Sequence, residues 1–232
     1  MAKRLFDVVL ATLGLVVATP ILLVAAIGIR LSSPGPILYR ARLIGRWGQP
    51  FTMYKLRTMH VHAPTAGPVI TAEVDPRVFA FGSFLRLSKI DELPQLVNVL
   101  RGEMSIVGPR PEHPTMVERY TAEQRETLRV RPGLSSPASL YDYTHGARLV
   151  GSKDPVAAYI NRLLPLRLEL ELVYVRRASL RYDIAIIGRT LWLIALTLLG
   201  KRSFPDPPEL REALTLLPRR RKSDRISPPA KM

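Results

Sequence analysis

The chain contains 232 residues and carries 34 Lys and Arg against 19 Asp and Glu, which gives a formal net charge of +15. Its length suggests one domain with appendages, and its positive charge would attract polyanions such as nucleic acid, anionic lipid headgroups or phosphorylated substrates. Apolar residues make up 47% of the chain, and the absence of cysteine excludes disulfides and thiol catalysis.

The first predicted element is an apolar stretch over residues 5–29, bounded by Lys3, Arg4 and Arg30. It is longer than the apolar core of a secretory signal and offers no clear A-x-A cleavage site. As a straight helix it would reach about 37 Å, enough to cross a hydrocarbon core of about 30 Å. The stretch is therefore predicted to be a membrane helix.

Two features predict that this helix bends and returns to the membrane face from which it started. Pro20 lacks an amide hydrogen and should kink the helix, and Thr19 beside it can hydrogen-bond freed backbone carbonyls. Basic residues flank both ends, so a span would violate the positive-inside preference at one of them. We therefore predict a re-entrant membrane helix over residues 1–30, with both ends cytoplasmic. A simple span is the alternative.

A small antiparallel β element is predicted next. Residues 33–36, Ser-Pro-Gly-Pro, have turn chemistry, and apolar residues then lie on both sides of a turn from Gly45 to Gly48. This pattern predicts a β-hairpin. Its second strand ends in Lys55 and Arg57, which are two residues apart and therefore share one face.

Residues 89–96, KIDELPQL, place two adjacent carboxylates in a basic chain. A helical stripe of apolar residues begins at Leu93. A purely structural interpretation follows, in which Asp91 is the N-cap or a first-turn residue and Glu92 is favoured by the helix dipole.

Nearby cations favour a catalytic interpretation of the same pair. Arg86 and Lys89 precede it, and the sequence GPRP supplies Arg110 in a rigid turn. An arginine guanidinium suits bidentate phosphate binding. Mg²⁺ is commonly held by one or two carboxylates plus substrate phosphates, which makes Asp91 and Glu92 candidate metal ligands. A spare carboxylate could attack phosphorus and form an acyl-phosphate.

A second apolar stretch covers residues 183–202 and is interrupted by Arg189. It predicts an interfacial amphipathic helix, with Arg189 snorkelling and Trp192 at headgroup level. A buried helix of the globular core is the alternative. Residues 201–232 are rich in Pro and Arg and predict a disordered basic tail.

These motifs resemble those of the bacterial sugar transferases, monotopic phosphoglycosyl transferases that act on polyprenyl phosphate. The resemblance rests on KRLFD, YKLRTM, RVRPGL and above all DELPQL followed by GEMSIVGPRP, and it covers roughly residues 3–200. It implies transfer of a sugar 1-phosphate from a UDP-sugar to polyprenyl phosphate, usually undecaprenyl phosphate, with release of UMP. This is the first membrane step of glycan assembly, for exopolysaccharide, O-antigen, capsule or glycoprotein. The implied location is the cytoplasmic face of the bacterial inner membrane.

The resemblance also implies residue roles. Asp91 matches the family's nucleophile, which carries a covalent phosphosugar, and Glu92 matches its partner at the Mg²⁺ site. Arg86 and Arg110 match arginines that are candidates for binding substrate phosphate. The family's proline-bent re-entrant helix matches the break predicted above.

The expected fold is therefore α/β and mostly helical, with a re-entrant membrane helix-hairpin broken at Thr19 and Pro20, a small antiparallel β element and interfacial amphipathic helices. We expect three segments: the membrane helix over 1–30, a catalytic domain over 31–200 and the tail over 201–232.

One departure concerns residues 134–143. Many family members follow RPG with a Thr-Gly-Trp-Ala-Gln-type segment, whereas this chain has LSSPASLYDY there, and no role is assigned to it. Two other functions are compatible with parts of the sequence: a membrane-anchored nucleic-acid binder and an inactive transferase-like scaffold. With only 7% aromatic residues, the chain lacks a base-stacking array, so nucleic acid is not an expected partner. The intact acid pair and Arg110 disfavour the scaffold.

Overall fold

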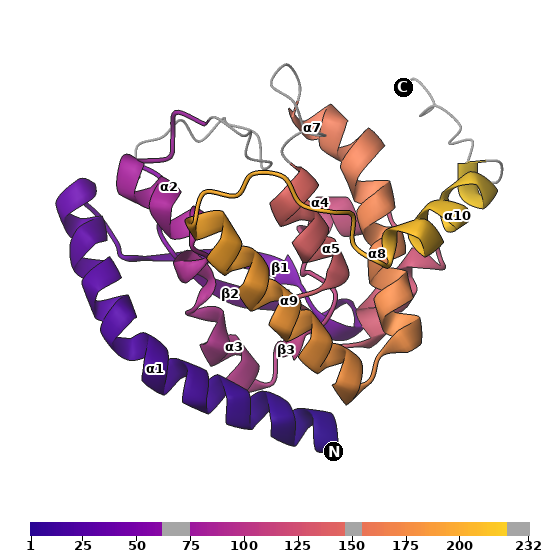
Figure 1. Ribbon diagram of the computed structural model, residues 1–232, viewed down its shortest axis with the longest axis horizontal. Coiled ribbons are helices and arrows are strands. Elements are labelled where there is room, and N and C mark those ends of the chain that lie inside the picture. The colour runs from indigo at the N-terminus through magenta and orange to yellow at the C-terminus, as the bar shows by residue number, and fades with distance from the viewer. Residues whose placement is uncertain (62–74, 147–154, 222–232) are drawn as a thin grey trace.

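The computed structural model describes residues 1–61, 75–146 and 155–221 (Figure 1). The prediction of a mostly helical α/β chain with a small antiparallel element is confirmed. In chain order the elements are α1 (Ala2–Ser32), β1 (Leu38–Ile44), η1 (Arg46–Gly48), β2 (Pro50–Leu56), α2 (Ala80–Leu87), η2 (Ile90–Glu92), α3 (Gln95–Arg101), β3 (Ser105–Val107), α4 (Pro114–Val117), η3 (Gln124–Arg129), β4 (Gly133–Ser135), α5 (Pro137–Tyr141), η4 (Asp142–Gly146), α7 (Pro155–Ala158), η5 (Tyr159–Leu163), α8 (Leu164–Arg177), α9 (Leu180–Leu198) and α10 (Leu210–Arg221).

The N-terminal helix α1 is continuous over 31 residues, with Pro20 inside it. Pro20 has no N–H to donate to the carbonyl of Val16. The Thr19 hydroxyl donates at 2.7 Å to the neighbouring carbonyl of Leu15, a back-bond that commonly accompanies a bend. Figure 1 shows α1 bent near its middle and lying along one side of the other elements. The predicted break is thus a bend within one helix and not the turn of a helix-hairpin.

The outer face of α1 is apolar. Among the described helices, α1 is the one whose length and apolarity would suffice to cross a membrane. Contiguous apolar exposure of this extent marks a surface that contacts lipid or protein rather than water. The large apolar side chains exposed along it are Leu5, Val9, Leu13, Val16, Val17, Ile21, Leu23, Val24, Ile27 and Leu31.

Polar side chains anchor the N-terminal end of α1 to the rest of the fold. The Arg4 guanidinium donates to the carbonyls of Val99 and Leu100 at 2.6 and 2.9 Å, where α3 ends and its carbonyls need donors. The Asp7 carboxylate is 1% exposed. It accepts hydrogen bonds from the Ser105 hydroxyl at 2.9 Å and the Ile106 amide at 3.0 Å. The motif KRLFD therefore docks α1 against α3 and β3.

Arg57 anchors the C-terminal end of α1. Its buried guanidinium donates to the Ser33 carbonyl at 2.6 Å, the Ser33 hydroxyl at 2.8 Å and the Pro36 carbonyl at 2.5 Å. Arg57 follows β2 directly, so this contact ties the end of α1 to the hairpin. Both ends of α1 are consequently fixed to the same globular body.

The predicted hairpin is confirmed. Strands β1 and β2 pair antiparallel from Leu38 opposite Leu56 to Ile44 opposite Pro50, with the short turn η1 between them. Lys55 contacts Glu92, whereas Arg57, one residue beyond the end of β2, contacts Ser33 and Pro36.

A second, two-stranded sheet pairs β3 with β4 in parallel. The chain segments that leave and enter these strands approach very closely at Gly108 and Gly133. A Cβ atom on Gly133 would lie 2.0 Å from the Gly108 nitrogen, so only glycine fits. This contact holds the GPRP segment against the RPGL segment.

Helix α8 runs through the interior, and α5, α10 and η3 pack against it (Figure 1). Its Leu168, Leu170 and Val173 belong to one apolar core, and its Tyr174 belongs to a second core that includes residues of α1, α3 and α9. Charged side chains on α8 are buried as well, among them Arg167 and Glu171.

Helix α9 differs in one respect from its prediction. Trp192 is exposed, as expected for an interfacial helix, and Ile186 and Leu193 are buried on another face of the helix. The Arg189 guanidinium, however, is paired within the fold: it donates to both carboxylate oxygens of Glu209 at 2.9 and 2.6 Å. A carboxylate from the following segment thus pairs with this charge, a contact that the snorkelling prediction does not include.

That carboxylate belongs to the segment predicted to be a disordered tail. Residues 201–209 cross back over the fold, and α10 then packs against α8 (Figure 1). Glu209 is 2% exposed, and the Tyr182 hydroxyl donates to it at 2.5 Å. The part of the tail over residues 222–232 lies outside the described residues.

Candidate active site

The acidic pair lies on η2, a 3-10 turn between α2 and α3. Helix α3 begins only at Gln95, with Pro94 as its N-cap residue and no side-chain cap. Asp91 is therefore not the N-cap of α3, and both acidic residues lie instead in the first turn of η2. Lys89, the N-cap residue of η2, has φ 60° and ψ 12°, a left-handed conformation that is uncommon outside glycine. This turn presents both carboxylates toward one group of cations.

Glu92 is buried among those cations. Its Oε1 lies 2.9 Å from the Lys55 ammonium, 3.4 Å from the Arg110 guanidinium and 3.7 Å from the Lys89 ammonium. Burial by itself would raise the pKa of the Glu92 carboxyl, but Lys55, Lys89 and Arg110 outweigh it and hold this pKa well below its usual value. These cations therefore favour the ionised form of Glu92.

Asp91 has the opposite electrostatic balance. It is 6% exposed, and its buried Oδ1 has no hydrogen-bond partner among the described residues. Burial, followed by repulsion from Glu92, raises the pKa of the Asp91 carboxyl, while Lys55, Lys89 and Arg86 oppose the rise. Adjacent carboxyls whose pKa values are pushed apart commonly have different chemical roles. The unpaired oxygen of Asp91 is the one available to bind or attack an electrophile.

Arg110 reaches this group from the GPRP segment. Attraction to Glu92 raises the pKa of its guanidinium. Its backbone N–H donates to Oε1 of Glu171 at 2.9 Å, and the same oxygen accepts a hydrogen bond from the Ser136 hydroxyl at 2.8 Å. Burial raises the pKa of Glu171 to about 7. Glu171 thus joins the Arg110 segment to the start of α5, inside residues 134–143.

Arg86 completes the group from α2. Burial lowers the pKa of its guanidinium, and the Asp91 carboxylate opposes this shift, so the two side chains interact electrostatically. The structure therefore brings together the four residues predicted for substrate chemistry, which are Arg86, Asp91, Glu92 and Arg110. With Lys55 and Lys89 they form the acid–cation cluster.

Three further residues were not predicted for the site. Lys55 was noted only for its strand spacing and Lys89 only for its position before the acid pair. Glu171 carries no local signal, because it lies 61 residues from its Arg110 partner in the sequence. Thr19 and Pro20 lie on α1 and do not belong to the acid–cation cluster.

An apolar groove opens from the acid–cation cluster. The cavity has a volume of about 580 Å³, and Lys89, Glu92 and Arg110 form its charged end. The rest is predominantly apolar. Its walls come mainly from α1 (Leu10, Leu13, Gly14 and Val17), α9 (Ile187, Thr190, Leu191 and Ile194) and residues 134–143 (Leu134, Ser135, Ser139, Leu140 and Tyr143).

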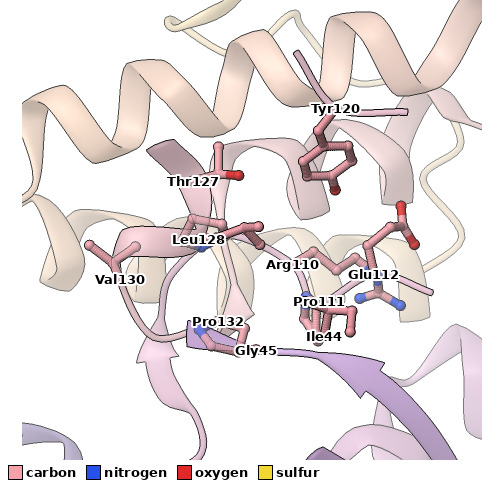
Figure 2. A pocket seen from close by; sticks show the side chains of 11 residues that line it. Ile44, Gly45, Arg110, Pro111, Glu112, Tyr120, Thr127, Leu128, Val130 and Pro132 are labelled. Atoms are coloured by element: carbon pink, nitrogen blue, oxygen red, sulfur yellow. The ribbon is translucent and has the colours of Figure 1, made fainter. Parts of the chain in front are cut away.

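A second cavity lies beside the GPRP segment, where Arg110 and Glu112 lie near Tyr120, Thr127 and Leu128 (Figure 2). Its volume is about 10 Å³, which is room for one water molecule at most. Substrate-sized space adjoining Arg110 is therefore found in the apolar groove.

Comparison with known proteins gives a consistent result. Residues 1–197 match the family model described as bacterial sugar transferase. The chain is 38% identical over 206 residues to the UDP-glucose:undecaprenyl-phosphate glucose-1-phosphate transferase of Xanthomonas campestris pv. campestris, covering 87% of this chain and 40% of that protein. It is 38% identical over 192 residues to the protein of the same name in Caulobacter vibrioides, covering 82% of this chain and 68% of that protein.

A relative named for a different sugar is also similar. The UDP-N-acetylgalactosamine-undecaprenyl-phosphate N-acetylgalactosaminephosphotransferase of Aeromonas hydrophila is 32% identical over 203 residues, covering 86% of this chain and 45% of that protein. The chain thus spans less than half of two of these three relatives.

Proposed function

The chain belongs to the bacterial sugar transferase family and is by homology an undecaprenyl-phosphate sugar phosphotransferase; we propose that it transfers a sugar 1-phosphate from a UDP-sugar to undecaprenyl phosphate through a covalent phospho-aspartate on Asp91. The reaction releases UMP and is the first step of polysaccharide synthesis. The observation that carries the covalent mechanism is the buried, unpaired Oδ1 of Asp91 among cations at the charged end of an apolar groove.

In the first step, an Asp91 carboxylate oxygen attacks the β-phosphorus, which bears the sugar. The bond from this phosphorus to the oxygen bridging the two phosphates breaks, and UMP leaves with that oxygen. Arg110 and Arg86 neutralise phosphate oxygens as charge shifts toward the leaving group. Glu92 stays ionised and holds Lys55 and Arg110 in place.

In the second step, an oxygen of undecaprenyl phosphate attacks the same phosphorus. The bond to the Asp91 oxygen breaks, which regenerates the carboxylate and leaves a diphosphate-linked sugar. Dividing the transfer in this way means that the soluble donor and the lipid acceptor need not be bound at the same time.

The acid pair also suits the Mg²⁺ that the family implies. The described residues contain no group of three or more His, Asp or Glu that could form an all-protein cage. Mg²⁺ does not require one, because it is usually held by one or two carboxylates together with substrate phosphates. The unpaired oxygen of Asp91 and the carboxylate of Glu92 would hold the ion, which would supply charge neutralisation for the phosphates.

The apolar groove is the proposed site of the lipid acceptor. An amphiphile with a phosphate head needs cations at one end and apolar walls beyond them. The cations at the charged end of the groove provide the first, and α1 and α9 provide the second. Because the volume of about 580 Å³ is typical of small-ligand sites, the groove would hold only the part of the chain nearest the phosphate.

The placement of α1 supports a re-entrant topology. Arg4 and Asp7 at one end and Arg57 at the other fix both ends of the helix to the same globular body. A straight crossing would separate these ends by the membrane thickness. We therefore propose that α1 dips into the cytoplasmic leaflet of the bacterial inner membrane, with α9 as an interfacial helix beside it and the acid–cation cluster on the cytoplasmic face.

UMP release by the purified full chain tests this function. The assay uses undecaprenyl phosphate, Mg²⁺ and a panel of UDP-sugars that includes UDP-glucose and UDP-N-acetylgalactosamine. Asp91→Asn should reduce turnover by about a thousandfold or more, since the nucleophile is lost. The matched control, Asp206→Asn, alters an exposed aspartate outside the cluster and should retain activity.

The outcomes separate the parts of the proposal. A stoichiometric burst of UMP without the lipid supports the covalent step, and its loss in Asp91→Asn assigns the nucleophile. Turnover of folded Asp91→Asn within tenfold of the unaltered protein would overturn the covalent mechanism. Release with a single sugar would identify the donor.

A further inference from the structure

Lys89 combines three features that the proposed chemistry leaves unexplained. It has a left-handed backbone conformation two residues before Asp91, at the start of the turn that carries the acid pair. Its ammonium lies 4.9 Å from the ring centroid of Tyr143. It also lines the groove, which Lys55 and Arg86 do not. Left-handed non-glycine residues are strained and tend to occur where the surrounding structure uses their geometry.

The distances around Glu92 leave Lys89 available for another anion. The close partner of Glu92 is Lys55, at 2.9 Å, whereas Lys89 is at 3.7 Å. The Lys89 side chain keeps 30% of its surface exposed. Cations also outnumber carboxylates in the acid–cation cluster, so it can accept a further negative group without losing its balance of charge.

Tyr143 holds the Lys89 ammonium toward the groove. Its hydroxyl donates to the Leu87 carbonyl at 2.6 Å, which fixes the ring beside the turn that contains Lys89. A cation over an aromatic face is oriented as well as attracted. Tyr143 belongs to residues 134–143, the segment that differs from many family members.

We propose that Lys89, oriented by Tyr143, is the binding residue for the phosphate of the prenyl-phosphate acceptor at the charged end of the groove. The ammonium acts as a point charge for this phosphate, while Arg86 and Arg110 contact the donor's phosphates. The inference rests on the proposed function and gives residues 134–143 a role in acceptor binding.

Binding without turnover tests the proposal directly. The protein is Asp91→Asn in nanodiscs, and the probes are undecaprenyl phosphate, undecaprenol and inorganic phosphate. Adding Lys89→Met, which keeps the apolar stem but removes the charge, should weaken undecaprenyl phosphate binding about tenfold to a hundredfold and leave undecaprenol binding unchanged. Lys89→Arg should recover most of the loss. Lys201→Met is the matched control, because Lys201 also lies over an aromatic ring, that of Trp192, but does not line the groove.

The Tyr143 variants test orientation. Tyr143→Phe keeps the ring and should weaken binding less than Tyr143→Leu, which removes it. In active protein, Lys89→Met should raise the KM for undecaprenyl phosphate about tenfold or more, and this loss should exceed its effect on the UMP burst in the absence of lipid, where Lys89 acts only through the charges of Asp91 and Glu92. A merely structural role for Lys89 would impair the KM for the lipid and the UMP burst to the same extent.

Three results would overturn the proposal: equal loss of phosphate and alcohol binding, an effect of Lys201→Met as large as that of Lys89→Met, or inorganic phosphate binding as tightly as the lipid. Failure of the proposed function looks different. If the unaltered protein gives no UMP burst but Lys89→Met still selectively weakens lipid phosphate binding, the covalent mechanism fails and the acceptor site stands.

Discussion

Two buried charge clusters are joined by the segment from Arg110 to Glu112, yet only one has the properties of an active site. In the acid–cation cluster, Arg110 contacts Glu92. In the second, which we call the arginine cluster (Glu112, Asp142, Tyr159 and Arg167), the Arg167 guanidinium lies 3.1 Å from Glu112 and 3.2 Å from Asp142, and it also contacts the Tyr159 hydroxyl.

Perturbed pKa values do not distinguish the two clusters. Burial raises the pKa of Asp142 as it does that of Asp91, and Asp142 also has a buried oxygen without a hydrogen bond among the described residues. The difference lies in net charge and access. Arg167 is outnumbered by carboxylates, and the cavity at Glu112 has room for one water molecule at most, whereas the acid–cation cluster has excess cations and opens onto about 580 Å³. Only the latter can receive a phosphate.

The largest effect on stability should come from breaking the arginine cluster. Arg167→Met leaves Glu112 and Asp142 buried without their cation, which should cost about 3–5 kcal/mol of the free energy of unfolding. Denaturant unfolding in detergent measures this loss. Arg176→Met is the control, because its ion pair with Glu123 is exposed and should contribute about 1 kcal/mol or less. If both variants cost the same, the arginine cluster does not serve the fold.

Glu171, which joins Arg110 to Ser136, should make stability depend on pH. Its pKa is about 7 in the folded chain and near 4.5 in a model compound. The folded state therefore holds the proton more tightly, so this contribution is fully present below pH 4.5 and is lost as the pH rises through 7. At about 1.4 kcal/mol per pKa unit, the loss is roughly 3 kcal/mol.

Glu171→Gln removes that titration while keeping an acceptor for the Arg110 amide and the Ser136 hydroxyl. The difference in unfolding free energy between the unaltered protein and the variant should shift by a few kcal/mol in favour of the variant between pH 4.5 and 7.5. Parallel pH profiles for the two proteins would show that Glu171 does not titrate in this range.

Lys55 tests whether the acid–cation cluster has separate donor and acceptor sides. It is the close partner of Glu92 but does not line the groove. Lys55→Met should therefore slow the UMP burst about tenfold to a hundredfold, through loss of a charged hydrogen bond, and leave undecaprenyl phosphate affinity within twofold. Lys89→Met should instead weaken undecaprenyl phosphate affinity more than it slows the burst. Identical patterns in the two variants would remove the distinction between donor and acceptor sides.

Local signals in the sequence predict the features that depend on local chemistry. The bend at Pro20 follows from a missing N–H, the β-hairpin follows from turn residues between apolar runs, and Arg110 follows from a rigid proline turn. The acid pair was found because two carboxylates in a basic chain are unusual. The apolar stripe begins at Leu93, two residues before α3 starts, so the sequence places the acid pair too close to the beginning of that helix.

Features that depend on distant partners could not be predicted in the same way. In α8 the sequence LRLELELV alternates apolar and charged residues, which is the period of a strand. It forms a helix buried on all sides because Arg167 and Glu171 find partners from other elements. Arg189 forms an ion pair with Glu209, which lies in a proline-rich segment that has the composition of a disordered tail. No local period encodes either contact.

The smallest effect should follow from straightening α1. Pro20→Ala restores a backbone donor and favours the helix by about 3 kcal/mol, which by itself would promote a straight crossing. The anchors at Arg4, Asp7 and Arg57 oppose it, because a crossing would break at least one of them.

Since the chain has no cysteine, Ala2→Cys provides a single site for labelling with an impermeant maleimide. In intact spheroplasts this cysteine should stay protected from maleimide labelling, both in the chain that keeps Pro20 and in the Pro20→Ala variant. Adding Asp7→Ala to Pro20→Ala removes a buried anchor and should expose a fraction of the cysteines to the outside. Labelling of the Ala2→Cys chain itself from outside would contradict re-entrance, because the N-terminal end of α1 would then lie across the membrane from the cytoplasm.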